Sequence, residues 1–145
     1  MSDLLERVWL LKQTPLFADV ETEDLQMVAQ ELDEETCVAG ERLFDRGDAG
    51  DRAYFIVHGR IGMSVHASPS AGEFIATLGE RECFGELCLL DDRPRAASAH
   101  VVQDATLLAL DRHKFRALIE RSPALALGVL RGYGARLRAT VTGAS

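Results

Sequence analysis

The chain has 145 residues and a formal net charge of −7, a length that suits one compact domain and is short for two. Its 47% hydrophobic and 27% charged residues are typical of a soluble globular protein and exclude the disordered and fibrous classes. The acidic excess argues against direct contact with nucleic acid, because such contact relies on lysine and arginine side chains that displace counterions from phosphates.

Three cysteines and a lack of long apolar runs indicate the compartment. Cys37, Cys83 and Cys88 form no CxxC pair and leave an odd thiol, which fits a reducing compartment better than a disulfide framework. No apolar stretch approaches the roughly 20 residues that a membrane-spanning helix needs, and the early acidic residues Asp3 and Glu6 do not fit a secretory signal peptide. We therefore expect a cytoplasmic protein with no membrane span in this chain.

Two helices are expected at the start of the chain, within residues 3–33. Apolar residues recur at helical spacing from Leu4 to Leu11, and Pro15 ends that pattern. A second helix is expected from about Glu21, because acidic residues suit the positive end of a helix dipole. Its predicted buried stripe consists of Leu25, Val28, Ala29 and Leu32.

Residues 34–110 are expected to form an antiparallel β-roll. Short apolar segments are separated there by glycines, a spacing typical of short strands and tight turns. These glycines are Gly40, Gly47, Gly50, Gly59, Gly62, Gly72, Gly79 and Gly85. Helices are expected again over residues 111–141, the last of them opening at Ser122 and Pro123. The predicted fold class is mainly β: a jelly-roll-like β-roll with N-terminal helices, one short internal helix and two C-terminal helices.

The segment from Phe84 to Ser98, FGELCLLDDRPRAAS, is where we expect the chemistry. A short helix opening at Gly85 would direct unpaired backbone N–H groups and a positive dipole end toward one point, which favours an anion. Arg95 follows a proline that restricts its backbone, so its guanidinium could pair with a phosphate through two charge-assisted bonds. The carboxylate of Glu86 could accept hydrogen bonds from sugar hydroxyls. The segment therefore suits a ribose phosphate.

This segment, read as FGELxLLxxxPRAAS, resembles the phosphate-binding cassette of the cyclic nucleotide-binding domain family. The upstream stretch GERLFDRGDAGDRAYFIVHGRI resembles that family's glycine-punctuated strands, and the resemblance extends to its two closing helices. It implies a β-roll that binds a 3′,5′-cyclic nucleotide, with the ribose on Glu86 and the cyclic phosphate on Arg95. It further implies amide contacts from Gly85, Leu87, Cys88, Ala96 and Ala97, supported by Phe84, Pro94 and Ser98.

The resemblance also implies a pocket for the base. Its apolar strand residues are expected at Met63 and Leu78, and a lid contact from the last helix at Arg136, with Thr140 and Thr142 as alternatives on the same helix. Relatives that prefer cGMP often carry threonine directly after the arginine, whereas this chain has Ala96. The expected ligand is therefore cAMP, with cGMP possible, and no cofactor is expected. Ligand capture is expected to move the C-terminal helix.

Two other functions are compatible with parts of the sequence. The same fold with an idle pocket would serve as an interaction or dimerisation module, and a homodimer through the C-terminal helix is possible. A cupin-type metalloenzyme would need clustered ligands, but His58, His66, His100 and His113 form no HxH or HxxxH pair. We therefore expect no metal site, no catalytic residues and no enzyme activity, and the effector partner is unknown.

Overall fold

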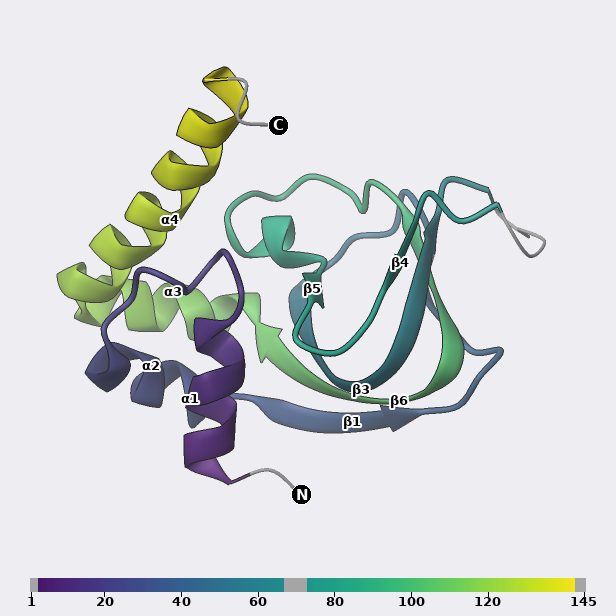
Figure 1. Ribbon diagram of the computed structural model, residues 1–145, viewed down its shortest axis with the longest axis horizontal. Coiled ribbons are helices and arrows are strands. Elements are labelled where there is room, and N and C mark those ends of the chain that lie inside the picture. The colour runs from purple at the N-terminus through teal and green to yellow at the C-terminus, as the bar shows by residue number, and fades with distance from the viewer. Residues whose placement is uncertain (1–2, 67–72, 143–145) are drawn as a thin grey trace. The chain divides into compact units, whose positions relative to one another are not determined.

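Figure 1 shows the computed structural model, which describes residues 3–66 and 73–142. The chain divides into two compact units, one formed by residues 32–112 and the other by residues 1–31 together with 113–145. The first unit carries the strands and the second carries most of the helices. The prediction of a mainly β fold with flanking helices is confirmed.

The helical unit contains α1 (Leu4–Lys12), α2 (Thr22–Ala29), α3 (Arg112–Arg121, whose first residue belongs to the strand unit) and α4 (Pro123–Val141). The side chain of Asp3 caps α1 by accepting the Glu6 N–H at 2.8 Å. Ser122 caps α4 by accepting the Leu125 N–H at 3.2 Å, and proline fills the first helical position. These ends are stabilised because the first N–H groups of a helix lack partners within it.

The second helix is shorter than the sequence suggested. It ends at Ala29, and Gln30 is its C-cap, so Leu32 lies beyond the helix although its side chain is buried. Apolar residues at helical spacing indicate which side chains are buried, and the buried side chains continue into the turn that leads to the first strand. The helix therefore ends before the series of buried side chains does.

The strand unit is one antiparallel sheet folded into a roll. It contains β1 (Asp33–Cys37), β2 (Arg42–Phe44), β3 (Arg52–Ser64), β4 (Ala76–Leu78), β5 (Cys83–Phe84) and β6 (Ser98–Asp111), with the 3₁₀ helix η1 (Glu86–Leu89) between β5 and β6. The sheet order is β1-β6-β3-β4, with β2 also on β6 and β5 also on β3. In Figure 1, β3 and β6 run side by side as the two longest, strongly curved strands.

The β3–β6 pair forms the frame of the roll. Its inward side chains pack with those of β1 and β5 into one apolar core that includes Ile56, Ile61, Leu107 and Phe84. Gly59 has a positive φ of 99°, and a Cβ there would lie 2.5 Å from the Asp104 carbonyl oxygen, so the register shift at this point requires glycine.

The same strand pair defines where the binding segment leaves the sheet. The last residue of β3, Ser64, pairs with the first residue of β6, Ser98, and both side chains are buried. Residues 65–97, which carry β4, β5 and η1, therefore start and finish at adjacent positions. Residues 84–97 of the predicted cassette lie within this segment.

Candidate functional site

Gly85 opens the short helix η1 and has to be glycine for two reasons. Its backbone is left-handed, with φ 72°, a conformation that costs residues with a Cβ more than it costs glycine. A Cβ at this position would also lie 2.5 Å from Nη1 of Arg95. The turn before η1 therefore brings the backbone directly against the arginine that follows the helix.

The guanidinium of Arg95 is held by backbone carbonyls and by an aromatic ring. Nη1 donates to the Gly85 carbonyl at 3.2 Å and Nη2 donates to the Arg52 carbonyl at 2.9 Å. Its Cζ lies 4.0 Å from the centre of the Phe44 ring, a cation–π contact. The Nε atom is buried without a hydrogen-bond partner. Two carbonyls thus use only part of the donor capacity of this side chain, which has five N–H groups.

Phe44 belongs to an aromatic stack beneath the cassette. Its ring lies 6.3 Å from that of Tyr54, and the Tyr54 and Phe84 rings are stacked at 5.1 Å. Such offset stacks stabilise a core beyond simple burial of area. Arg95 therefore rests on a rigid apolar base that β2, β3 and β5 build together.

Arg112 connects the end of η1 to the loop before β3. Its Nε donates to the Cys88 carbonyl at 2.6 Å, its Nη2 donates to the Gly50 carbonyl, and its Nη1 lies 3.5 Å from the Asp92 carboxylate. The side chain is only 15% exposed. This arginine pairs with one carbonyl near the end of η1 and with one in the loop before β3, and it thereby fixes the position of the cassette helix.

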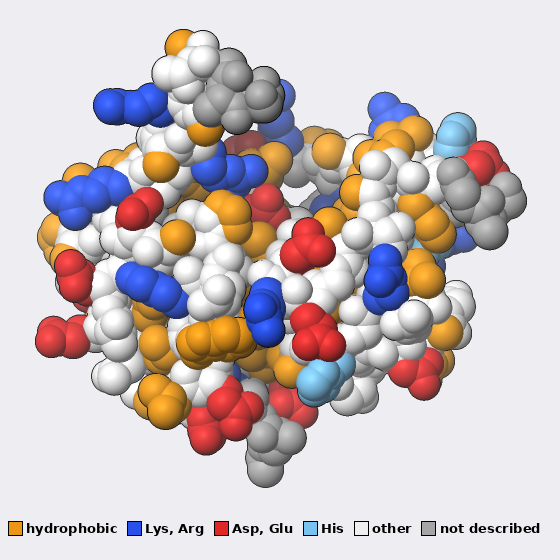
Figure 2. Space-filling view, viewed as in Figure 1, with side chains coloured by type: hydrophobic (Ala, Val, Ile, Leu, Met, Phe, Trp, Pro, Cys, Tyr) orange, Lys and Arg blue, Asp and Glu red, His pale blue; other side chains and the backbone are white. Residues whose placement is uncertain are grey.

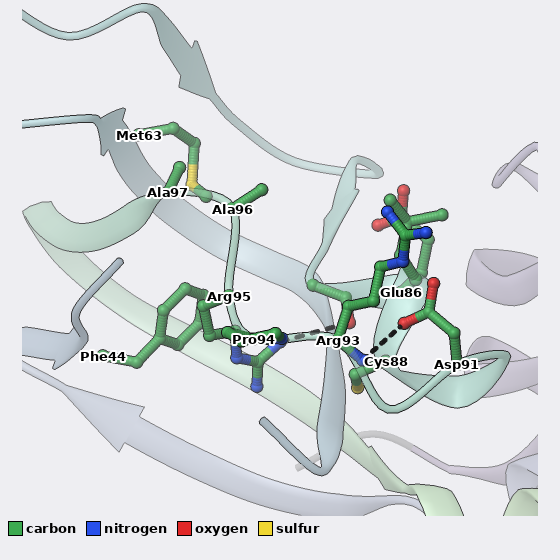
Figure 3. A pocket seen from close by; sticks show the side chains of 12 residues that line it. Phe44, Met63, Glu86, Cys88, Asp91, Arg93, Pro94, Arg95, Ala96 and Ala97 are labelled. Carbon is green, nitrogen blue, oxygen red and sulfur yellow. Dashed lines mark hydrogen bonds between the residues drawn. The ribbon is translucent and has the colours of Figure 1, made fainter. Parts of the chain in front are cut away.

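A pocket of about 390 Å³ opens over the cassette. Figure 3 shows Arg95 beside Phe44, with Met63 and Ala97 nearby, whereas Glu86, Asp91 and Arg93 lie toward the opposite end. Its lining consists of Phe44, Met63, Gly85, Glu86, Leu87, Cys88, Asp91, Arg93, Pro94, Arg95, Ala96 and Ala97. Apolar side chains, two acidic residues and two arginines therefore meet in one concave site.

Most of the predicted site residues line this pocket, and four do not. Phe84 lies below it in the aromatic stack, and Ser98 accepts the Arg46 N–H on its Oγ at 2.8 Å. Leu78 pairs with Ile61 in the β3–β4 ladder and packs against the roll core. On α4, the Arg136 guanidinium lies 5.6 Å from the Tyr133 ring. Roles for Leu78 and Arg136 at a base stay predictions.

The two alternatives for the lid contact bond to their own helix. Thr140 Oγ1 donates to the Arg136 carbonyl at 3.1 Å, and Thr142 Oγ1 donates to the Arg138 carbonyl at 2.9 Å. Such back-bonding is common for threonine on helices. A hydroxyl engaged in this way can still accept a hydrogen bond from an N–H group of a base, but it would have to exchange partners before it could donate to one.

Three lining residues were not predicted from the sequence. Asp91 and Arg93 lie inside the quoted cassette, and the Asp91 carboxylate accepts the Arg93 N–H at 3.1 Å to shape the turn before Pro94. Their position between helix and proline was a usable signal. Phe44 lies far upstream, and only the pairing of β2 with β6 brings it to Arg95.

Cys88 lines the pocket as a buried thiol and not as a reactive one. Burial raises its pKa above the ordinary value, and the nearby Arg95 and Arg112 only partly oppose this shift. A thiol held in its protonated form is a poor nucleophile and a poor metal ligand. The side chain therefore acts as a small apolar wall of the site.

The histidines are dispersed in the described part of the chain. His58 lies 3.9 Å from Glu80, and the ring of His100 packs against Phe74 at 5.7 Å. Within residues 3–66 and 73–142, no three His, Cys, Asp or Glu side chains come together as metal ligands would. Over the same residues, no helix has the length and apolar character needed to cross a membrane.

Comparison with known proteins identifies the family. A family model described as the cyclic nucleotide-binding domain matches residues 34–122, which include the roll, the cassette and α3. The chain therefore belongs to the cyclic nucleotide-binding domain family, as its sequence predicted.

Three proteins illustrate the similarity. The cyclic AMP receptor protein of Thermus thermophilus is 33% identical over 128 residues, which are 88% of this chain and 59% of that protein. The N-terminal domain of a transcriptional regulator from Streptomyces coelicolor A3(2) matches with a TM-score of 0.80 and 32% identity, over 92% of this chain and 93% of that one. The regulatory domain of Toxoplasma gondii PKA, crystallised with cAMP, matches with a TM-score of 0.71 and 29% identity, over 81% of this chain and 46% of that one. This chain thus spans less than two thirds of the Thermus receptor.

Proposed function

We propose that this chain is a regulatory domain that captures a 3′,5′-cyclic nucleotide in the cassette pocket. One observation carries the proposal: the structure brings Arg95, Glu86 and the first turn of η1 around a single cavity of about 390 Å³. A pocket of this size, mostly apolar with a few converging polar groups, suits a small ligand. Membership of the cyclic nucleotide-binding domain family supports the same ligand class.

The polar groups suit the two polar parts of a cyclic nucleotide. The cyclic phosphate would lie at Arg95, where free donor capacity remains on a guanidinium supported by Phe44. Further donors would be the N–H groups at the start of η1, because the first N–H groups of a helix have no partner within it. The ribose hydroxyl would donate to the Glu86 carboxylate, which lines the same cavity. A carboxylate accepts only, so it suits the hydroxyl and repels the phosphate.

The base would lie against the apolar part of the pocket. Met63 and Phe44 line it, and Leu78 and Arg136 remain proposed contacts from β4 and α4. We favour cAMP over cGMP because Ala96 offers no hydroxyl for a guanine amino group. The Toxoplasma structure with cAMP and the Thermus cyclic AMP receptor support this preference by similarity.

Regulation would follow from a change in the C-terminal helix. A ligand can shift a conformational equilibrium only by its differential affinity for the two states, so contacts from α4 to the bound base would produce the response. In this proposal, hydrogen exchange of α4 slows when the ligand binds. Equal protection of α4 with and without ligand would contradict it.

A homodimer through α4 is a second proposal with its own observation. Five positions of α4 follow heptad spacing, and their apolar members are exposed: Leu127 47%, Leu130 66%, Leu137 65% and Val141 75%, with Gly134 at the remaining position. Figure 2 shows both hydrophobic and basic side chains exposed on the part of the surface that this helix forms. A repeat of apolar residues at alternating three- and four-residue steps is the pattern that pairs helices in coiled coils. This surface would also serve the chain if its pocket were idle.

Two further parts of the proposal concern nucleic acid binding and the cellular location of the chain. We propose that this segment does not itself bind nucleic acid, because its net charge is −7 and acidic side chains are interspersed among the basic ones on the face in Figure 2. We also propose a cytoplasmic location, because Cys37, Cys83 and Cys88 are all free thiols. The domain would regulate a partner and would not catalyse a reaction.

Calorimetric titration of the purified chain with cAMP and with cGMP tests the proposal directly. Mass spectrometry first has to show that no nucleotide was purified with the protein. Micromolar or tighter binding to one nucleotide would support the function and rank the two ligands. An absence of heat with both, from folded and empty protein, would overturn it and favour the dimerisation module.

A further inference from the structure

The loop from Phe44 to Gly50 surrounds the cassette arginine although most of it lies outside the pocket lining. We call this segment the 44–50 loop. The Arg95 N–H donates to the Asp48 carbonyl at 2.8 Å, and the Gly47 N–H donates to the Arg95 carbonyl at 2.8 Å. On the far side of Ala96 and Ala97, Ser98 Oγ accepts the Arg46 N–H of the same loop at 2.8 Å. The backbone of the cassette is therefore paired with this loop on both sides of the two alanines.

The loop is itself held in shape by a local pair of bonds. The Asp45 N–H donates to the Asp48 carboxylate at 2.9 Å, and the Asp48 N–H donates back to the Asp45 carbonyl at 3.1 Å. Aspartate side chains commonly stabilise turns by such bonds to nearby backbone. The loop can therefore act as a fixed surface for the arginine beside it.

The side chain of Arg95 fits between two residues of this loop. The Phe44 ring supports the guanidinium, with its centre 4.0 Å from Cζ. On Gly50, a Cβ would lie 2.1 Å from Nε, 2.4 Å from Cζ and 2.8 Å from Cδ of Arg95. These distances are far shorter than any van der Waals contact, so the space that a side chain at position 50 would need is filled by the guanidinium.

The backbone of Gly50 gives no other reason for glycine. Its φ lies outside the left-handed region, so other residues could adopt its conformation. Its carbonyl accepts from Arg112 Nη2, a bond that any residue could make. Position 50 is therefore restricted by the Arg95 side chain and not by the turn.

We infer that Gly50 and Phe44 are positioning residues for Arg95: glycine at position 50 admits the guanidinium, and the Phe44 ring holds it in line with the pocket. The inference rests on the proposed function, because it assigns Arg95 to the cyclic phosphate. Gly50 itself lies outside the pocket lining and acts only through the arginine. Bidentate recognition of a phosphate depends on the orientation of the guanidinium plane, so a displaced Arg95 loses affinity even while it stays charged.

The experiment compares two identical substitutions in the strand unit. Gly50→Ala places a methyl group against Arg95, whereas Gly79→Ala is the matched control, because a Cβ there meets no atom within 4 Å and its φ is not left-handed. Titration with cAMP should show binding weakened about tenfold or more by Gly50→Ala, the effect of losing one hydrogen bond to a charged group, and unchanged by Gly79→Ala. In an Arg95→Ala background, Gly50→Ala should cause no further loss of affinity.

A second arm needs no ligand. In urea unfolding, Gly50→Ala should lower stability when Arg95 is present and have little effect in the Arg95→Ala background, because the two residues compete for one space. Phe44→Leu should weaken cAMP binding several-fold when Arg95 is present and cause no further loss in the Arg95→Ala background, which separates positioning of Arg95 from a direct contact of Phe44 with the base. These results together would support the positioning role.

The outcomes separate this inference from the proposed function. If the wild-type chain binds neither cAMP nor cGMP, the proposed function fails, and the role of Gly50 in binding fails with it. If the wild type binds and Gly50→Ala binds equally tightly, the proposed function stands and the positioning role is overturned. A loss of stability of equal size in both backgrounds would also overturn it, since Gly50 would then act independently of Arg95.

Discussion

Replacing Arg95 by alanine should remove most of the affinity for cyclic nucleotide. The guanidinium is the charged partner of the phosphate in the proposed complex, and loss of such a partner typically costs about 2 to 5 kcal/mol. At about 1.4 kcal/mol for each factor of ten, this is a loss of about 30-fold to about 4,000-fold in affinity. Isothermal titration with cAMP measures it directly.

The same substitution should also lower the stability of the unliganded protein. Arg95 donates to the carbonyls of Gly85 and Arg52, and a hydrogen bond that involves a charged group contributes about 1.5 to 3 kcal/mol. Urea unfolding of the variant therefore has to accompany the titration. Binding is to be compared only at temperatures where both proteins are folded.

Arg93→Ala is the matched control for Arg95→Ala. Both arginines line the pocket, so the two variants change the charge near the ligand equally, but Arg93 is exposed and is bonded to Asp91 through its backbone N–H. An exposed charge contributes about 0.2 to 1 kcal/mol, which is at most about fivefold in affinity. Equal losses in the two variants, or a loss of no more than about fivefold in Arg95→Ala, would refute the assignment of the phosphate to Arg95.

Three further predictions concern the ribose, the pH and the dimer. Glu86→Gln should weaken cAMP binding by about tenfold to a hundredfold, the cost of one hydrogen bond to a charged group, and 2′-deoxy-cAMP should lose affinity for the wild type only; an equal loss in both proteins would contradict the ribose role. Burial, with Arg42 adding and Asp45 opposing, lowers the pKa of His100 below its usual 6.5. As the pH falls, His100 therefore gains a proton in the unfolded chain before it does in the folded chain, so the free energy of unfolding should decrease below pH 6.5. In urea unfolding, His100→Leu should show a smaller decrease over the same pH range. A decrease as large as that of the wild type would exclude His100 as the cause. Leu137→Asp should yield a monomer in sedimentation experiments if the exposed face of α4 pairs two copies, whereas an unchanged mass would count against the dimer.

The cassette could be predicted from the sequence because it is continuous. Gly85, Glu86 and Arg95 lie within a short stretch, and local rules for helix starts, glycine turns and residues after proline act over that distance. The structure places these three residues around one pocket, and no long-range pairing has to be known beforehand. The mainly β fold was predictable for a similar reason, since turn glycines punctuate the strands.

What the sequence could not supply depends on pairing between distant segments. Phe44 and Gly50 reach Arg95 only because β2 pairs with β6 and the loop after β2 pairs with the cassette. Phe44 stands in the stretch RLFDRG next to polar residues, and nothing in that local sequence indicates a contact with Arg95. Leu78 shows the converse, because an apolar strand residue fits a base pocket and a roll core equally well, and here it packs against the core.

The pairing of Ser64 with Ser98 has a consequence for how the site is assembled and exchanged. The β3–β6 ladder holds together the two ends of the segment formed by residues 65–97. Pairing in the sheet therefore offsets the entropic cost of bringing these ends together, and ligand binding does not have to offset it. The arrangement of the pocket therefore depends on the β3–β6 ladder. Exchange of this segment with that of a relative would therefore also have to preserve Phe44 and Arg112, because these residues outside it contact Arg95 and the Cys88 carbonyl.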